Sequence, residues 1–258
     1  MKMNPLSVID PNAKIGKDVK IGNFVTIEGD VIIGDGTEIM SGAVIMNGSR
    51  IGKNCKIFQY AVIGNVPQDL KFKGEYSLAE IGDNTVIREF VTVHRGTNSR
   101  GTTKIGNNCL IMAYNHIGHD CVIGNNIIMS NACQVAGEVE IDDHAVIGGG
   151  TLIHQFSLIG GYSMIQGGTR ISKDVPPYAM IGREPMRFIG LNLVGLRRRG
   201  FSTEKIGEIT KLYHILYQDG LNMKQALAKA EEEIPESEEK QYVINFIKKS
   251  NRGIANNK

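Results

Sequence analysis

Residues 105–147 read IGNNCL-IMAYNH-IGHDCV-IGNNII-MSNACQ-VAGEVE-IDDHAV-I, and every group of six opens with Ile, Val or Met. The same phase runs from Ile9 to Ile171, where 25 of 28 such positions hold one of these three residues. A six-residue period is neither the ~3.6 of an α-helix nor the alternation of a strand with one buried face. It is typical of short parallel strands joined by tight corners, with one hexad on each face of a β-solenoid.

The other places of the hexad support this geometry. The fifth place is mostly small, as at Ala43, Ala61 and Ala145, which suits a second inward side chain at a crowded corner. Gly, Asn, Asp and Lys are frequent at the second to fourth places and tolerate turn backbone or face water. With three hexads in a coil, residues at the same place of successive coils are predicted to stack about 4.8 Å from one another. The core is therefore expected to consist of columns of isoleucine that lengthen with every coil.

Composition and cysteine placement narrow the class of protein. All four cysteines occupy the small fifth place, which predicts buried free thiols: Cys55, Cys109, Cys121 and Cys133. No pair has the C-x-x-C spacing of a redox or zinc motif. The N-terminal stretch lacks the apolar segment of a signal peptide, and no run approaches the roughly 20 apolar residues of a membrane span. A net charge of +2 argues against binding to nucleic acid or a membrane surface, and a cytoplasmic protein is expected.

The chain divides where the period changes. We expect a solenoid over 1–177, a connecting segment over 178–200 and a helical C-terminal domain over 201–258. In the last part, Ser202 can cap a helix that runs to about Tyr217, and Asn222 can cap a second one to about Glu232. A third helix is predicted over roughly 237–249.

The hexads lapse twice, over 64–80 and 96–104. Both interruptions preserve the downstream phase, so each can leave the solenoid as a loop at one corner without twisting the coils. Loops that protrude from a rigid scaffold are where binding residues collect.

His119 is the most informative polar residue of the solenoid. It is third in its hexad, an outward place, and Gly137 takes the same place one coil later, so the two are predicted to stack. Without a side chain at Gly137, its backbone N–H is open to a ligand beside the imidazole. A base next to a free amide is the minimum needed for acyl transfer, because one accepts a proton and the other stabilises an oxyanion. The alternative is a solvated histidine beside the gap that a glycine leaves.

A metal site is a second alternative, with His94, His116 and His119 as ligands. Hexad-repeat solenoids that bind zinc typically use two histidines five residues apart, whereas His116 and His119 are three apart and straddle a corner. We therefore expect no metal.

Several motifs, in one order along the chain, carry a resemblance to a known family. They are QDLK at 68–71, IREFVTVHRGT at 87–97, YNHIGHDC at 114–121, HQF at 154–156, DVPPY at 174–178 and GLRRRGF at 195–201. The chain resembles the UDP-N-acetylglucosamine acyltransferases, the hexapeptide-repeat enzymes that open lipid A biosynthesis in Gram-negative bacteria. The resemblance extends over essentially the whole sequence, including both loops and the tail.

The resemblance implies a fold, an assembly and a reaction. The fold is a left-handed parallel β-helix with a C-terminal helical domain, although parallel crossovers are right-handed in nearly all other folds. The assembly is a homotrimer with active sites between subunits. The reaction moves a 3-hydroxyacyl group from acyl carrier protein to the 3-hydroxyl of UDP-N-acetylglucosamine. Because the carrier brings the acyl thioester on its phosphopantetheine, no cofactor of the enzyme's own is expected.

The resemblance also assigns roles to residues. His119 is the general base, Asp120 orients it, and Gly137 provides the oxyanion hole. The residues implied to hold the nucleotide sugar are Asp69, Lys71, His116, His154, Gln155, Asn192, Arg198 and Arg199, with the two arginines on the phosphates. Gly167 matches the position that measures the acyl chain, where a glycine leaves room for a long chain. The alternative for Gly167 is a turn glycine that permits a positive φ.

Two positions depart from the family pattern. Glu138 stands where many members have His, and Val194 stands where many have Glu. Two other functions remain open on the sequence. One is the related N-acyltransferase that acts two steps later, although that enzyme usually has an extra domain before its hexads. The other is a catalytically silent solenoid used as a scaffold, for which two phase-preserving loops beside an outward histidine have no evident use.

Overall fold

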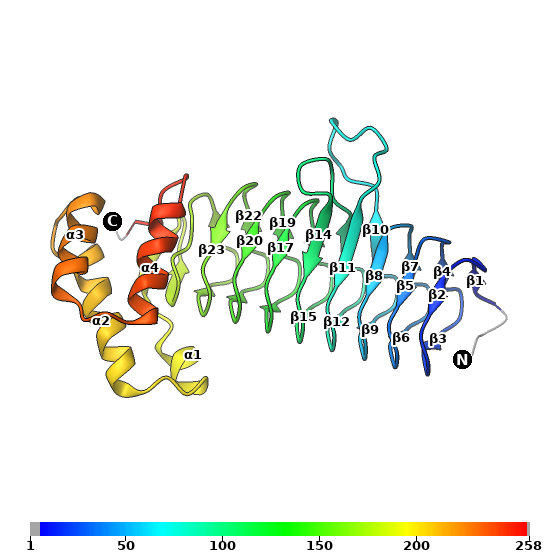
Figure 1. The fold of residues 1–258 in the computed structure, drawn as a ribbon, viewed down its shortest axis with the longest axis horizontal. Coiled ribbons are helices and arrows are strands. Elements are labelled where there is room, and N and C mark those ends of the chain that lie inside the picture. Colours follow the sequence, from blue (N-terminus) through cyan, green and yellow to red (C-terminus); the bar gives the residue numbers. More distant parts are fainter. Residues whose placement is uncertain (1–5, 257–258) are drawn as a thin grey trace.

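The computed structural model describes residues 6–256 and contains a long prism whose three faces are sheets (Figure 1). Most strands are only two residues long, and successive strands pass from one sheet to the next, so neighbours in a sheet come from successive coils. The first sheet has the order β1 (Val8–Ile9), β4 (Thr26–Ile27), β7 (Val44–Ile45), β10 (Val62–Asn65), β13 (Thr92–His94), β16 (His116–Ile117), β19 (Gln134–Val135), β22 (Leu152–Ile153), β25 (Arg170–Ile171).

The other two faces repeat this arrangement. The second sheet has the order β2 (Lys14–Ile15), β5 (Ile32–Ile33), β8 (Ser49–Ile51), β11 (Leu78–Ile81), β14 (Thr102–Ile105), β17 (Val122–Ile123), β20 (Glu140–Ile141), β23 (Leu158–Ile159). The third runs from β3 (Lys20–Ile21) through β6 (Glu38–Ile39), β9 (Lys56–Ile57), β12 (Val86–Ile87), β15 (Leu110–Ile111), β18 (Ile128–Met129), β21 (Val146–Ile147), β24 (Met164–Ile165), β26 (Ala179–Gly182) and β27 (Arg187–Leu191). We call the turns that follow the first, second and third sheets the first, second and third corners.

The predicted stacking of successive coils is present. Ile27 pairs with Ile45, and Ile117 pairs with Val135, so each inward side chain lies on its counterpart of the next coil. These residues are almost fully buried, and so are the small residues of the fifth hexad place, including the four cysteines, which are free. The core is therefore a set of columns that runs the length of the prism.

The fourth place of most hexads takes the left-handed backbone conformation. Asn and Gly occupy it at several corners, as expected for turns, but the third corner also places Tyr60, Phe90 and Tyr114 there, with φ of 58°, 57° and 63°. Their exposed rings stack, with centroid distances of 5.3 Å between the first two and 5.0 Å between the last two. This ring ladder is a feature that the hexad pattern did not predict.

Both predicted loops leave the first corner, and Figure 1 shows them rising beside β10 and β14. Ile63 pairs with Val93, five hexads later, and Ile81 pairs with Ile105, four hexads later, instead of the regular three. The insertions are thus two hexads and one hexad long, which keeps the core in phase. The loops are shorter than predicted, because β10, β11 and β14 extend into the ranges 64–80 and 96–104.

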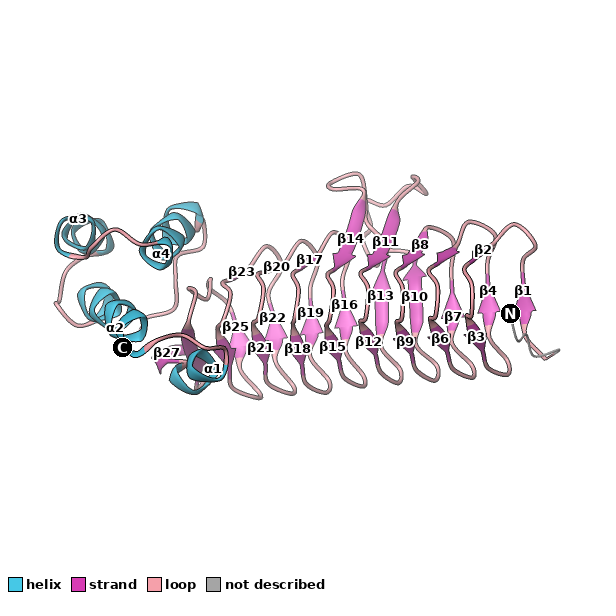
Figure 2. Cartoon of the chain, turned by 60° about the horizontal axis from the view of Figure 1, so that its bottom comes forward, coloured by secondary structure: helices cyan, strands magenta, loops and turns pink. Residues whose placement is uncertain are grey.

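The C-terminal part closes one end of the prism (Figure 2). The helices are α1 (Leu193–Arg198), α2 (Thr203–Tyr217), α3 (Met223–Glu233) and α4 (Glu238–Lys249), and Ser202 and Asn222 cap α2 and α3 as predicted. The predicted connecting segment contains two strands that the sequence did not predict, since β26 continues the third sheet and pairs antiparallel with β27. The hydroxyl of Tyr242 in α4 donates to Asp142 of the solenoid. No helix within residues 6–256 is long and apolar enough to cross a membrane.

Candidate active site

His119 lies at the first corner, between β16 and β17, with its imidazole against Gly137 of the next coil. A Cβ built on Gly137 would come within 2.5 Å of Nε2 of His119, so only glycine leaves room for the ring there. Asp69 of the first loop approaches the same nitrogen to 3.9 Å, and the side chain of His119 is only 11% exposed. The alternative of a solvated surface histidine is therefore wrong.

Asp120 holds the imidazole from the other side. Its Oδ2 lies 2.8 Å from Nδ1 of His119, and the carboxylate is fully buried. Because a carboxylate only accepts hydrogen bonds, Nδ1 carries a proton, and in the neutral imidazole the lone pair is then on Nε2. This arrangement leaves Nε2 able to accept a proton from a bound molecule.

The backbone N–H of Gly137 is available to a ligand. At the second corner, several N–H groups of the third hexad place donate to an Asp or Asn side chain of the next coil, as Lys17 does to Asp35 at 2.7 Å and Asn107 to Asn125 at 2.9 Å. Within residues 6–256 the N–H of Gly137 has no such acceptor. The imidazole of His119 and an N–H without an acceptor are thus adjacent, in the stacking that the sequence predicted.

The two loops lie together over this corner. Asp69 also accepts a hydrogen bond from the N–H of Lys71 at 2.9 Å, while the Lys71 side chain is exposed. The loops contact one another where the N–H of Asn98 donates to the carboxylate of Glu75 at 3.1 Å. The predicted sugar-binding pair is therefore close to His119, and the second loop supports the first.

Two more histidines lie next to this centre. His94 is buried, and its ring packs edge-on against that of His116 at a centroid distance of 4.7 Å. Burial and the neighbouring His116 and His119 lower the pKa of His94 to about 4, and burial together with His119 lowers the pKa of His116. Nδ1 of His116 pairs with the Thr92 hydroxyl at 2.8 Å. No group of three His, Cys, Asp or Glu side chains in the described chain could hold a metal ion.

A groove crosses the outer face of the first sheet. It is lined by His116, Gln134, Leu152, His154 and Arg170 together with the adjoining strand residues. Of the predicted cleft residues, His116 and His154 line this groove. Gln155 follows His154 at the first corner, one coil beyond Gly137.

Gly167 lies at the third corner, on the opposite edge of the first sheet from His119. The positive φ at this turn belongs to Gly168 and not to Gly167, so the alternative of a glycine required by its own φ is wrong for Gly167. A Cβ on Gly167 would lie 3.0 Å from the carbonyl oxygen of Gly149, which is a tight contact.

Three predicted residues lie elsewhere in the chain. Asn192 is buried as the N-cap of α1, where it accepts from the N–H of Gly195 and donates to the carbonyl of Tyr162 at the second corner. Arg198 and Arg199 follow at the end of this helix. Within one chain, these residues therefore lie at a different corner of the prism from His119.

The two positions that depart from the family pattern are Glu138 and Val194. Glu138 accepts a hydrogen bond from the Ser99 hydroxyl of the second loop at 2.9 Å, and Val194 is exposed on α1. The contacts of the second loop with Glu138 and Asp120 were not predicted, because a six-residue period contains no information on loop conformation.

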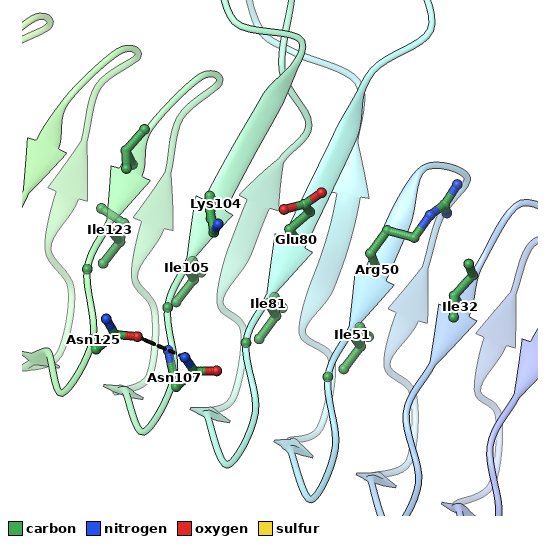
Figure 3. Close-up of a pocket in the computed structure, with 15 residues that line it drawn as sticks. Ile32, Arg50, Ile51, Glu80, Ile81, Lys104, Ile105, Asn107, Ile123 and Asn125 are labelled. Atoms are coloured by element: carbon green, nitrogen blue, oxygen red, sulfur yellow. Dashed lines mark hydrogen bonds between the residues drawn. The ribbon is translucent and has the colours of Figure 1, made fainter.

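Another groove lies on the second sheet, on the other flank of the loops (Figure 3). Its outer face presents Arg50, Glu80 and Lys104 on successive strands, so charges of opposite sign alternate along it. Arg50 is already paired with Asp30 at 2.6 Å. The described residues that line this groove include no histidine, so the first corner is the candidate active site.

Known families match most of this chain. A family model described as UDP-N-acetylglucosamine O-acyltransferase, domain 2, matches residues 174–255, and a model of the bacterial transferase hexapeptide matches 30–65 and 102–131. The acyl-[acyl-carrier-protein]–UDP-N-acetylglucosamine O-acyltransferase of Sulfurihydrogenibium sp. is 54% identical over 78% of this chain and 74% of its own. The enzyme of the same name from Halorhodospira halophila is 41% identical over 98% of both chains.

Solved structures are similar to this chain over nearly its whole length. The UDP-N-acetylglucosamine acyltransferase from Bacteroides fragilis superposes with a TM-score of 0.96 at 53% identity, over 98% of this chain and 99% of the other. The enzyme of that name from Campylobacter jejuni has a TM-score of 0.94 at 38% identity over the full length of both. The predicted left-handed β-helix with a helical C-terminal domain is confirmed.

Proposed function

Since this chain belongs to the family of UDP-N-acetylglucosamine O-acyltransferases, we propose that His119 is the general base of an acyl transfer at the first corner. The enzyme transfers an acyl group from acyl carrier protein to UDP-N-acetylglucosamine. The observation that carries the proposal is the free Nε2 of His119 beside the N–H of Gly137, which has no acceptor in the described chain, with Nδ1 held by Asp120.

The proposed step begins at the 3-hydroxyl of the sugar. Nε2 of His119 accepts its proton while the oxygen attacks the thioester carbonyl of a 3-hydroxyacyl group. The positive charge that develops on the imidazole is stabilised by the buried carboxylate of Asp120. The carbonyl oxygen becomes an oxyanion, which the N–H of Gly137 stabilises. When the intermediate collapses, the C–S bond breaks and the imidazolium returns the proton to the departing thiolate of the carrier's phosphopantetheine. The chemistry needs no metal or cofactor of the enzyme's own.

The substrates are assigned to the surfaces around this centre. Asp69 and Lys71 are proposed to hold the sugar, with His116, His154 and Gln155 along the cleft. The acyl chain is proposed to cross the first sheet from His119 toward Gly167, because these residues lie at the two edges of one sheet. The groove lined by Leu152 and His154 supports this path.

We also propose a homotrimer in which each active site lies between two subunits. Asn192 contacts the second corner, and Arg198 and Arg199 end the helix that it caps, whereas His119 lies at the first corner. A site that uses both sets can form only where the first corner of one subunit meets the second corner of another. Four buried free cysteines further support a reducing compartment, so we propose that the reaction takes place in the cytoplasm.

The function is tested by measuring thiol release from 3-hydroxyacyl-carrier protein with UDP-N-acetylglucosamine as acceptor. We expect His119→Ala to lower turnover by about 10²–10⁴-fold, the usual contribution of a general base. The matched control is His214→Ala, since this histidine lies in α2 and pairs with Asp219 at the surface, far along the chain from the site. A His119→Ala enzyme with more than about a tenth of normal turnover would refute the base assignment.

Two further measurements test the finer points. Turnover of UDP-3-O-acylglucosamine in place of UDP-N-acetylglucosamine would instead support the N-acyltransferase. For the assembly, His119→Ala and Arg198→Ala subunits are mixed, and recovery of activity in heterotrimers is expected because one of the sites then has both walls intact. No recovery in well-mixed heterotrimers contradicts sites between subunits.

A further inference from the structure

The second loop, residues 95–101, encloses the carboxylate of Asp120. The backbone N–H of Thr97 donates to both oxygens of this carboxylate, at 3.0 Å to Oδ1 and 3.1 Å to Oδ2, and the Thr97 hydroxyl donates to Oδ2 at 2.7 Å. The N–H of Arg100 donates to Oδ1 at 3.1 Å, and Nδ1 of His119 completes the set. A fully buried carboxylate must be compensated by hydrogen bonds, and most of them come here from one loop.

We infer that Thr97 is a positioning residue for the acyl transfer, acting on His119 through Asp120. This inference rests on the proposed role of His119. The hydroxyl of Thr97 and Nδ1 of His119 share a single oxygen, Oδ2 of Asp120. The hydroxyl is thus the side-chain donor, beside the backbone N–H groups of Thr97 and Arg100, that holds the carboxylate oxygen to which the imidazole donates. Because Oδ2 accepts from the ring, Nδ1 must carry a proton, so the arrangement also selects the neutral tautomer in which Nε2 has the lone pair.

The loop is itself fastened to the solenoid. The N–H of Ser99 donates to the Thr97 hydroxyl oxygen at 3.1 Å, and the Ser99 hydroxyl donates to Glu138 at 2.9 Å. The guanidinium of Arg100 pairs with Glu140 at 2.7 Å. These contacts explain what Glu138 does in this chain: it anchors the loop that holds Asp120.

The other charged or titratable groups around the centre are few. Asp69 lies 3.9 Å from Nε2 of His119, and His116 and His94 lie beyond it on the first sheet. Since none of these groups donates to Asp120, Thr97 can be changed without altering a charge near the imidazole.

The test compares Thr97→Val with Thr97→Ser. Valine has the shape of threonine and keeps the backbone N–H but lacks the hydroxyl, whereas serine keeps the hydroxyl. Thr102→Val is the matched control, because Thr102 lies at the start of β14 and its hydroxyl has no hydrogen-bond partner within residues 6–256. Each enzyme is measured for kcat, for KM of both substrates and for melting temperature. The tautomer of His119 is read from ¹⁵N NMR spectra of the free enzyme, with His119→Gln to assign the ring signals.

Loss of a hydrogen bond to a charged group is expected to lower kcat of Thr97→Val by about 10-fold or more, with both KM values within about twofold. The His119 signals should also leave the single Nδ1–H form. Thr97→Ser should recover most of kcat and the ring signature, and Thr102→Val should match the unchanged enzyme. A normal kcat in Thr97→Val, or an equal loss in the valine and serine enzymes, would overturn the inference. The ring spectrum does not depend on turnover. A tautomer shift in Thr97→Val, together with an active His119→Ala enzyme, would show that Thr97 orients the ring but would refute the base assignment and, with it, the role of Thr97 in the transfer.

Discussion

Gly137→Ala changes the active site by one methyl group, and its effect can be worked out from the stacking of two coils. The new Cβ would lie 2.5 Å from Nε2, 2.6 Å from Cε1 and 3.0 Å from Cδ2 of His119. It would therefore press on the face of the ring. The backbone of Gly137 is not in the left-handed region, so alanine meets no conformational penalty of its own.

The ring must yield by roughly 1 Å, the difference between these contacts and ordinary van der Waals distance. Asp120 resists this movement because it is buried and held by the second loop. A misplacement of about 1 Å can lower a rate by about 10²-fold, so we expect kcat to fall by about two orders of magnitude. The melting temperature should change little, because the inward columns of the core are untouched.

The assay is steady-state thiol release, with circular dichroism to monitor unfolding. Gly207→Ala is the control for a glycine-to-alanine change, since a Cβ there meets nothing within 4 Å. A Gly137→Ala enzyme with kcat within about threefold of normal would show that the imidazole does not need its present position, and would refute the reasoning.

Three other outcomes are expected. Gly207→Ala should raise the free energy of unfolding by about 0.5–1 kcal/mol in urea titrations, because the glycine lies inside α2. Burial lowers the pKa of His94 from its ordinary 6.5 to about 4. The unfolded chain therefore binds a proton between these two pH values, and the free energy of unfolding should be highest above pH 6.5 and fall as the pH drops toward 4. His94→Gln should make the urea midpoint less dependent on pH across that range. Gly167→Met should shift relative rates on donors of graded length toward shorter chains, since each buried methylene contributes about 0.8 kcal/mol; an unchanged preference would contradict the acyl path.

The sequence was most informative where one residue determines one contact. The stacking of Ile117 on Val135, and of His119 on Gly137, follows from counting, because a parallel coil repeats every three hexads. The contact between Thr97 and Asp120 does not follow from any period, since it depends on the path of a loop. The burial of His119 was missed for the same reason, because Asp69 approaches it from the other loop.

In the C-terminal part, too, local features were predicted from the sequence and contacts between distant segments were not. Ser202 and Asn222 predicted helix starts because capping is local and the chemistry of one side chain is enough. The pairing of β26 with β27 was missed because it depends on how the segment lies against the end of the third sheet. Aromatic residues at left-handed positions, such as Phe90, were equally unpredictable, since their backbone cost is offset by stacking on rings of other coils.

Because each of the two loops adds a whole number of hexads, changes in a loop can affect catalysis without affecting the stability of the solenoid. Ile63 pairs with Val93 and Ile81 pairs with Ile105 as if the inserted hexads were absent. A lineage can therefore lengthen, shorten or rewrite a loop by whole hexads while every downstream coil keeps its neighbours. Changes in the loops at the first corner can therefore alter substrate preference while the core stays intact. A scaffold of this kind favours the divergence of many transferases from one repeat, because most loop mutations that do not improve function still leave the protein folded.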